Sequence, residues 1–164
     1  MRLLSWLATA QWGGEAMAAT IEQRLDVIES KLACMDLVHT YARLIRSDQP
    51  EHIAALFTED GTFEGRNGHP DKPEFTQMFR DEGRAAVDAH MMPMKGKPHP
   101  VPLIHNLSIE VDGDTARGNC VMEAQIYGTQ TKVKGEYHDS FRRVDGKWLF
   151  SSRIYTVFRG DSNL

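Results

Sequence analysis

The sequence predicts an α+β fold in which three N-terminal helical regions pack on one face of a strongly bent antiparallel sheet. In the first half of the chain, apolar residues recur at spacings of three and four, which is the period of a helix. In the last third they alternate with polar residues, which is the period of a strand. Two Val-Asp-Gly sequences, at 111–113 and 144–146, mark hairpins between these runs. A curled sheet over helices makes a cone whose interior can hold a small molecule.

The first element is expected to be a long helix over about residues 19–46. Thr20 and Gln23 have the spacing of a capping box at its start. A helix of this length exceeds the common range, so we expect a kink or break near residues 31–35. The face that packs on the core is predicted from residues spaced three and four apart, namely Ile21, Leu25, Ile28, Leu32, Met35 and Val38.

Breaker residues and alternation predict the remaining elements. Pro50 suits the first position of a short helix that runs to Phe57. A short strand is expected at 61–65, a loop at 66–74, a third helical region at 75–92 and irregular chain at 93–102. The four strands of a meander follow at 106–112, 115–127, 132–144 and 147–159.

Composition restricts the partners and the compartment. The net charge of −4 leaves no basic surplus for binding nucleic acid, and no apolar stretch is long enough to span a membrane. Cys34 and Cys120 are interpreted as buried apolar residues, and such sparse cysteine usage favours the reducing cytoplasm. Residues 1–16 are expected to be a disordered extension and residues 17–160 a single domain.

Cofactor and metal motifs are missing from the sequence. It contains no P-loop, glycine-rich dinucleotide motif or nucleophile elbow, so no cofactor is expected. Met91, Met92 and Met94 lie close to His90 and His99, and thioether and imidazole groups together can bind copper. Their spacing matches no recognised ligand pattern. We therefore expect no metal and interpret the methionines as flexible side chains at the mouth of an apolar pocket.

Six short sequences follow one another along residues 20–158: YAR at 41–43, AALFTEDGTF at 54–63, GRAAV at 83–87, NLSIEVDGDTARG at 106–118, GEYHD at 135–139 and DGKWLFSSR at 145–153. Their order and spacing resemble the SnoaL-like branch of the nuclear transport factor two-like superfamily, which includes scytalone dehydratase, ketosteroid isomerase and the bile-acid dehydratases. The resemblance implies a cystatin-like, cone-shaped barrel in which the sheet wraps around the long helix. It also implies a pocket at the wide end and homodimers that pair through the sheet.

Dehydratases of this family share a polar set inside an apolar pocket. It comprises a tyrosine on the first helix, an aspartate five residues later, a histidine just before the third strand and an aspartate on the next strand. The resemblance places Tyr41 at the tyrosine. The other three positions fall at Arg46, near Pro102 and at Ala124. The standard aspartate–histidine dehydration is therefore not expected here unchanged.

Nearby polar residues offer substitutes for the missing groups. His105 and His99 flank the expected histidine position, and imidazole carries protons well near pH 7, although both can equally be rim or capping residues. Asp48 can supply a carboxylate to the pocket or simply cap the following helix. Arg46 can stabilise a developing oxyanion, or it can be a surface cation that suits the end of the helix dipole.

Strand parity predicts the pocket lining, because alternate side chains along a strand face the same side. Parity divides each strand into two rows, and the resemblance places the row that contains Cys120, Met122 and Ala124 on the inward side; the row that contains Tyr137 and Asp139 is expected to face inward as well. A carboxylate on this apolar face needs a partner, so we expect Asp139 to form a salt bridge with Arg153, the alternative being a polar group of the pocket. The expected ligand contacts are Phe63, Met92, Cys120, Met122, Ala124, Tyr137 and Asp139.

The sequence thus predicts a cofactor-free lyase or isomerase that acts on a hydrophobic, aromatic or polycyclic hydroxy or carbonyl compound. In this prediction His105 moves a proton, Tyr41 hydrogen-bonds a substrate oxygen and Arg46 stabilises an oxyanion. The alternative is a small-molecule-binding or assembly subunit without catalysis, like the dioxygenase small subunits of the superfamily. A pocket that gathers these groups around one point favours the enzyme, and a His105 that faces solvent favours the binding protein.

Overall fold

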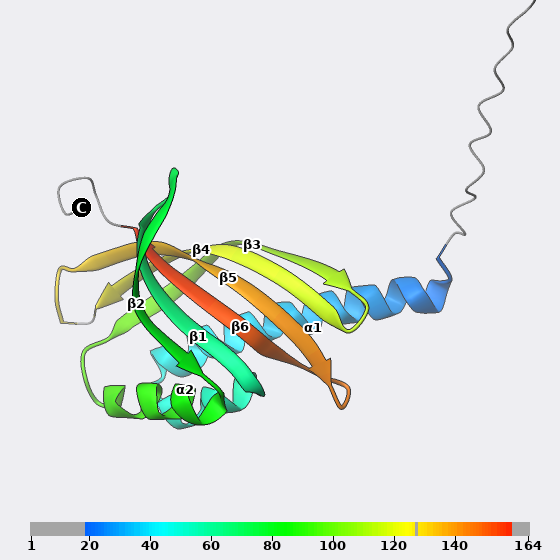
Figure 1. Ribbon diagram of the computed structural model, residues 1–164, viewed down its shortest axis with the longest axis horizontal. Coiled ribbons are helices and arrows are strands. Elements are labelled where there is room, and N and C mark those ends of the chain that lie inside the picture. The colour runs from blue at the N-terminus through cyan, green and yellow to red at the C-terminus, as the bar shows by residue number, and fades with distance from the viewer. Residues whose placement is uncertain (1–18, 127, 159–164) are drawn as a thin grey trace, which may run out of the picture.

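The computed structural model describes residues 19–126 and 128–158 and places a six-stranded sheet over a long helix (Figure 1). The prediction for residues 1–16 lies outside these residues. Helix α1 spans Ile21–Arg46, and the 3₁₀ turns η1 (Pro50–His52) and η2 (Ala54–Leu56) lead into the sheet. The strands are β1 (Phe57–His69), β2 (Lys72–Glu82), β3 (Pro100–Asp112), β4 (Thr115–Ile126), β5 (Lys132–Val144) and β6 (Lys147–Phe158), with α2 (Arg84–Met91) and η3 (Met92–Met94) between β2 and β3. The predicted α+β class is confirmed.

The strand order is β2-β1-β6-β5-β4-β3, so the predicted meander forms one side of the sheet. Gly113, Asp145 and Gly146 have the positive φ angles that tight hairpin turns require. β1 and β6 pair in parallel, whereas the other neighbours pair antiparallel. The sheet is therefore mixed, because the chain passes through α2 and the meander before β6 returns beside β1 in the same direction.

The segment predicted as a loop and a third helical region is mostly a hairpin. β1 runs over residues 57–69 and pairs with β2 over 72–82, so the predictions of a loop at 66–74 and a helix from 75 are wrong. The helix begins only at Arg84, after Gly83 with a φ of 86°. β3 likewise begins at Pro100, where irregular chain was expected. β2 and β3 are the two edge strands, and prolines are tolerated there because they need not donate to a neighbouring strand.

Helix α1 starts with the predicted capping box, in which Thr20 N–H donates to Gln23 Oε1 (2.8 Å) and Gln23 N–H donates to Thr20 Oγ1 (3.2 Å). The helix continues to Arg46, so the expected break near residues 31–35 does not occur. The predicted core face is wrong for the first half of the helix. Its buried residues are Ser30, Cys34, Leu37, Val38 and Tyr41, whereas Ile21, Leu25, Ile28 and Leu32 are exposed.

The reason is that the sheet covers α1 from the opposite side. Arg143 on β5 binds the Asp26 carboxylate through two hydrogen bonds, Nη1 to Oδ1 at 2.7 Å and Nη2 to Oδ2 at 3.0 Å. This ion pair turns the Asp26 side of the helix toward the sheet. In Figure 1 the N-terminal end of α1 also extends past the ends of the β3–β4 and β5–β6 hairpins.

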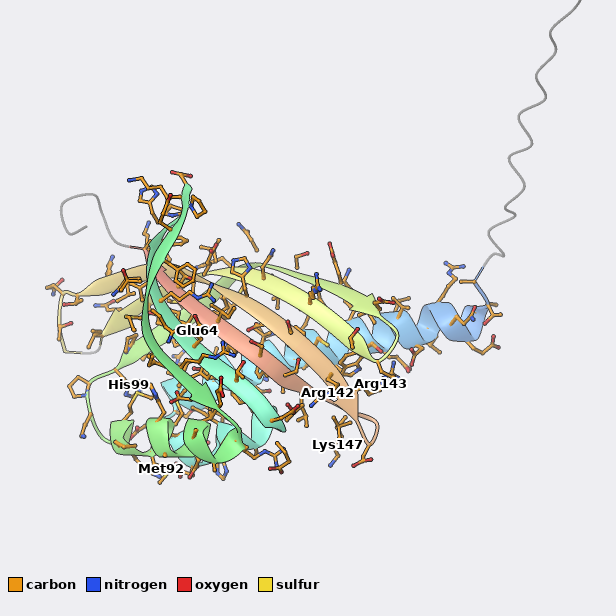
Figure 2. The ribbon with its side chains drawn as sticks, viewed as in Figure 1. Glu64, Met92, His99, Arg142, Arg143 and Lys147 are labelled. Atoms are coloured by element: carbon orange, nitrogen blue, oxygen red, sulfur yellow. The ribbon has the colours of Figure 1, made fainter. Side chains whose placement is uncertain are left out.

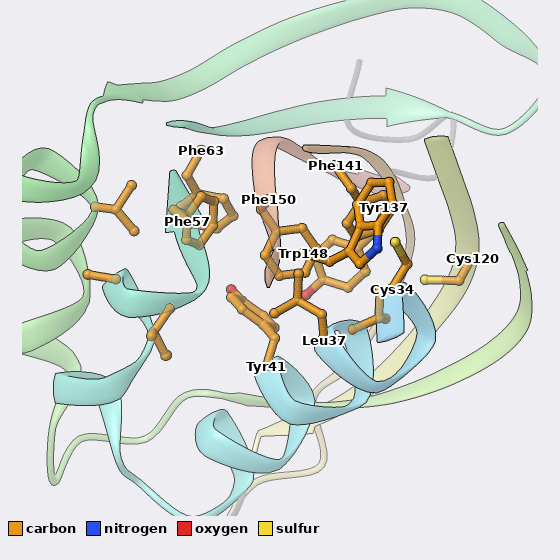
Figure 3. Packing of buried hydrophobic residues seen from close by; sticks show 14 of the residues in the cluster. Cys34, Leu37, Tyr41, Phe57, Phe63, Cys120, Tyr137, Phe141, Trp148 and Phe150 are labelled. Atoms are coloured by element: carbon orange, nitrogen blue, oxygen red, sulfur yellow. The ribbon is translucent and has the colours of Figure 1, made fainter. Parts of the chain in front are cut away.

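The core lies between α1 and the concave face of the sheet and is rich in aromatic rings (Figure 3). The labelled rings are Tyr41, Phe57, Phe63, Tyr137, Phe141, Trp148 and Phe150. Cys34 and Cys120 are buried free thiols, as predicted, and burial raises their pKa values to about 12 and about 11. Within the described residues, no helix has the length and apolar character needed to cross a membrane.

Candidate functional site

An apolar cavity of about 180 Å³ opens at the C-terminal end of α1. Its wall combines that end of the helix, η1, α2 and η3 with inward-facing residues of the sheet. A dry apolar cavity of about 150 Å³ is large enough for a benzene-sized ring, so this one suits a small aromatic compound. The fold therefore provides an apolar cavity at the place where the resemblance implies a small-molecule pocket.

Strand parity identifies the inner face of the sheet correctly. Cys120, Met122 and Ala124 are buried, whereas the residues that alternate with them are exposed. Met122 and Ala124 line the cavity, as do Phe63 and Tyr137. Cys120 is buried on the same row and does not line the cavity.

Tyr41 projects from α1 into this wall and is almost fully buried. Burial raises the pKa of Tyr41 to about 12, although the nearby Arg153 charge opposes the rise. The side chain therefore stays a neutral phenol, which can donate a hydrogen bond to a ligand oxygen. Tyr137 packs edge-on against it at 6.1 Å between ring centroids, and burial raises the pKa of Tyr137 well above its ordinary value.

Beneath these tyrosines lies the predicted pair of Asp139 and Arg153, both fully buried. Arg153 Nε lies 3.4 Å from Asp139 Oδ1. The guanidinium carbon lies 4.1 Å from the Tyr41 ring centroid and 3.9 Å from that of Tyr137. Neither side chain lines the cavity, and neither Asp139 oxygen has a hydrogen-bonding partner among the described residues. The pair supports the aromatic floor of the pocket.

The protonation of this pair follows from its burial. Desolvation raises the pKa of Asp139 to about 6, and the Arg153 charge offsets only part of the rise. Desolvation is the largest influence on Arg153 and disfavours the cation, but Asp139 together with Tyr137, Tyr41 and Cys120 opposes it, and the pKa of Arg153 is raised. Asp139 is thus ionised near neutral pH and becomes neutral in mild acid.

Two predicted catalytic residues lie away from the cavity. His105 is exposed on the outer face of the sheet, opposite Val121, so the expectation that it points into the pocket is wrong. The physical reason is parity, because Pro102 faces inward on the same strand and His105 is an odd number of residues away. Arg46 is exposed at the last position of α1 and does not line the cavity.

His99 and Asp48 line the cavity mouth. Their polar side-chain atoms contact backbone groups of neighbouring segments. His99 Nδ1 lies 2.7 Å from the Lys97 carbonyl oxygen, and Nε2 lies 2.9 Å from that of Ile45. Both Asp48 oxygens accept from the Gly96 N–H, at 3.1 and 2.9 Å. These bonds tie the segment before β3, where Figure 2 shows His99, to the end of α1. Both side chains thus shape the mouth.

The expected ligand contact at Met92 is wrong. The side chain is 41% exposed and does not line the cavity, and Figure 2 shows Met92 at the outer side of the helical segment. Its neighbours Met91 and Met94 line the cavity instead. The thioethers of Met91 and Met94 therefore contribute to the cavity wall, and that of Met92 does not.

The dehydratase histidine and acid positions both lie in the cavity wall. Pro102 and Ala124 line the cavity and pair directly across β3 and β4. Neither side chain can accept or donate a proton. Any acid–base group of this pocket must therefore come from another part of the wall.

Such a group is His90 on α2, whose role the sequence did not indicate. It lines the cavity, and its Nδ1 lies 2.9 Å from Asp81 Oδ2 at the end of β2. The contact is an ion-pair distance without hydrogen-bond geometry, and Asp81 Oδ2 is buried with no hydrogen-bonding partner among the described residues. The imidazole also packs against Phe63 and Phe79, with centroid distances of 5.7 and 4.3 Å. A carboxylate beside one ring nitrogen favours a proton there and leaves the other nitrogen for a ligand.

A bent sheet around a long helix, with an apolar cavity at its wide end, defines an α+β barrel of the nuclear transport factor two-like class. The sequence model of the SnoaL-like domain matches residues 26–154. The chain therefore belongs to the SnoaL-like family. No curated protein matches the chain.

Solved structures give the same fold. A protein of unknown function from Mycobacterium tuberculosis is 26% identical, with a TM-score of 0.67 and coverage of 80% of this chain and 78% of that one. A putative scytalone dehydratase from Novosphingobium aromaticivorans is 21% identical, with a TM-score of 0.63 and coverage of 82% and 87%. The β subunit of a putative aromatic-ring-hydroxylating dioxygenase from the same organism is 17% identical, with a TM-score of 0.65 and coverage of 80% and 90%.

Proposed function

We propose that this protein is a cofactor-free lyase or isomerase that acts on a small aromatic hydroxy or carbonyl compound. The observation that carries the proposal is the His90–Asp81 pair in the wall of an apolar cavity that also contains the Tyr41 phenol. Both rings pack against Phe63, at centroid distances of 5.7 Å from His90 and 6.4 Å from Tyr41. An apolar pocket with a few polar groups is the usual form of such a site.

In the proposed reaction, the Asp81 carboxylate 2.9 Å from Nδ1 favours a proton on that nitrogen, so Nε2 of His90 carries the lone pair that accepts a proton. It removes a proton from the carbon next to the substrate carbonyl. The Tyr41 hydroxyl donates a hydrogen bond to the carbonyl oxygen and stabilises the enolate. The proton then returns either to a departing hydroxyl group, which leaves as water, or to another carbon. The first outcome is a lyase reaction and the second an isomerisation.

The proposal replaces His105 with His90 as the proton carrier, and it assigns no catalytic role to the exposed Arg46. His99 and Asp48 keep a role at the mouth, where their contacts with backbone groups position the wall. Tyr137, Phe63, Met122 and Ala124 supply the surface that contacts the ring of the substrate.

The second candidate function is binding without catalysis. Two observations favour it: Pro102 and Ala124 occupy the dehydratase positions, and His105 faces solvent. The similar dioxygenase β subunit gives an example of the fold within an assembly. The two candidates differ in whether a bound ketone loses a proton.

The test is hydrogen–deuterium exchange of 2-tetralone, a bicyclic aromatic ketone, followed by proton NMR in deuterated buffer. The enzyme proposal predicts faster exchange beside the carbonyl with the protein than with buffer alone. His90→Gln should slow the protein-catalysed exchange by about 10²- to 10⁴-fold, the usual contribution of a positioned acid–base group. Tyr41→Phe should slow it as well.

His105→Gln is the matched control, because it removes an exposed histidine from the other face of the sheet. It should leave the exchange rate unchanged. Equal exchange rates for wild type and His90→Gln would overturn the catalytic assignment. A rise in melting temperature with 2-naphthol, together with no catalysed exchange, would identify a binding protein.

A further inference from the structure

Phe79 brings an aromatic ring into the cavity wall from β2, which is an edge strand of the sheet. The ring packs against Phe63 and His90, at centroid distances of 5.1 Å and 4.3 Å. It therefore contacts both the aromatic wall and the imidazole to which the proposed function assigns the proton transfer. Phe79 is half-buried, so its ring lies between the cavity and solvent on this side.

Gly65 on β1 leaves the space that this ring occupies. It is buried and pairs directly with Phe79 in the register of β1 and β2. A Cβ at Gly65 would lie within 2.7 Å of three atoms of the Phe79 ring, whereas carbon atoms in contact are about 3.5 to 4.0 Å apart. The φ angle of Gly65 is not positive, so backbone conformation does not explain the glycine. The close approach of the ring explains it.

The strand pairing on both sides of Gly65 directs the ring inward. The register of β1 with β2 shifts just after Gly65, and Met78 on β2 is the extra residue of a β-bulge. Bulges change the direction of neighbouring side chains and are common beside active sites. On its other side, Gly65 pairs with Tyr155 on β6, which also lines the cavity. The Phe79 ring thus fills the gap that the missing side chain of Gly65 leaves in the wall.

We propose that Phe79, seated over Gly65, is a specificity-determining residue that limits the ligand of this cavity to one or two aromatic rings. The cavity volume of about 180 Å³ is close to the roughly 150 Å³ that holds one benzene molecule. The Phe79 ring occupies the space into which a third fused ring would extend toward β2. Compounds with three or more fused rings are therefore excluded.

Binding of 2-naphthol and 9-phenanthrol, which have two and three fused rings, tests this limit in the full chain. The fluorescence of each ligand gives its Kd. Phe79→Ala removes one six-membered ring from the wall, so the ratio of the two affinities should shift toward 9-phenanthrol. The expected shift is about 10- to 200-fold, which is the discrimination that an apolar pocket reaches from small differences in size. Phe79→Leu, which keeps an apolar side chain on β2, should shift the ratio less and in the same direction.

Phe75→Ala is the matched control, because it removes the same ring from another position of β2. Phe75 is 50% exposed, its ring lies 3.9 Å from the Arg66 guanidinium carbon, and it does not line the cavity. The affinity ratio of this variant should equal that of wild type. If the ratio is also unchanged in Phe79→Ala and Phe79→Leu, with wild-type circular dichroism, Phe79 does not set the size of the ligand and the proposal is wrong.

Gly65→Ala tests how the ring is seated. Its methyl group should push the Phe79 ring off β1 and into the cavity, so the affinity for 2-naphthol should fall by about 10-fold or more. In Gly65→Ala/Phe79→Ala the methyl group meets no ring, so the affinity should equal that of Phe79→Ala. An equal loss in both backgrounds would overturn the role of Gly65.

This inference rests on the proposed function for the class of ligand, but its readout is binding. Loss of the catalysed exchange of 2-tetralone would overturn the catalytic assignment and leave the affinity ratio as it is. An unchanged affinity ratio in the Phe79 variants would overturn the size limit even where exchange is catalysed.

Discussion

The buried pair of Asp139 and Arg153 gives the sharpest stability prediction. The Asp139 carboxylate has no hydrogen-bonding partner among the described residues, and its one cation lies 3.4 Å away. Loss of hydration therefore outweighs attraction to Arg153, and the pKa of Asp139 rises from 3.8 to about 6. The neutral form is the one that folding favours. Asp139→Asn, which imitates that form, should therefore stabilise the protein near neutral pH.

The size of this stabilisation and the pH range in which it appears follow from the same pKa values. A pKa that is higher in the folded state adds stability below the unfolded value of 3.8, and this stability is lost as the pH rises through about 6. The difference between the two values corresponds to about 3 kcal/mol, at about 1.36 kcal/mol per pKa unit. Asp139→Asn should therefore be about 3 kcal/mol more stable than wild type at pH 7, and within about 1 kcal/mol of it near pH 4.

Urea unfolding followed by tryptophan fluorescence, repeated from pH 4 to pH 7.5, measures this difference. Glu110→Gln is the control, because it removes an exposed carboxylate from β3 and should follow the wild-type pH dependence. A loss of about 3 to 5 kcal/mol in Asp139→Asn at pH 7 is the result expected when a net favourable buried pair is broken. That outcome would refute the reasoning, because it would show that Arg153 more than compensates the burial of Asp139.

Two further substitutions test the frame of the fold. Gly135→Ala should lower the free energy of unfolding by about 3 kcal/mol or more in urea titrations. The reason is that the new Cβ would lie 2.1 Å from the Thr156 carbonyl oxygen. Unchanged stability would show that β5 and β6 separate easily at this point. Thr20→Ala removes the capping box and should destabilise by about 1 kcal/mol, with more amide hydrogen exchange in the first turn of α1. Equal exchange in both proteins would mean that the cap does not hold that turn.

The meander and its inward rows were predictable because the chain alternates strictly and its turns are short. With the tight turns at 113 and 145 fixed, a residue's face follows from counting, which placed Met122, Ala124 and Asp139 correctly. The same count, started from Pro102, would have placed His105 outside. That error came from matching a family position without applying parity.

The His90–Asp81 pair was not predictable from the local pattern. Residues 75–92 were interpreted as a helical region that could be interrupted near Gly83, and in a continuous helix positions 81 and 90 lie on opposite sides, since nine residues make two and a half turns. In the structure Asp81 ends an edge strand and His90 follows on a separate helix, so the chain reverses between them. The pairing of β2 with β1, a contact between distant residues, decides this arrangement. The exposed apolar face of α1, formed by Ile21, Leu25, Ile28 and Leu32, has the same origin, because periodicity reveals an apolar face and only the sheet decides which face is covered.

The two cysteines give this chain native probes of how its core opens. Cys34 lies on α1 and Cys120 lies on β4, and both are buried free thiols. Only the thiolate form reacts with alkylating reagents, so each thiol is protected until its surroundings open. Measured labelling rates at the two positions would therefore compare detachment of the helix with opening of the sheet. No engineered label is needed, because the sequence contains two cysteines in all.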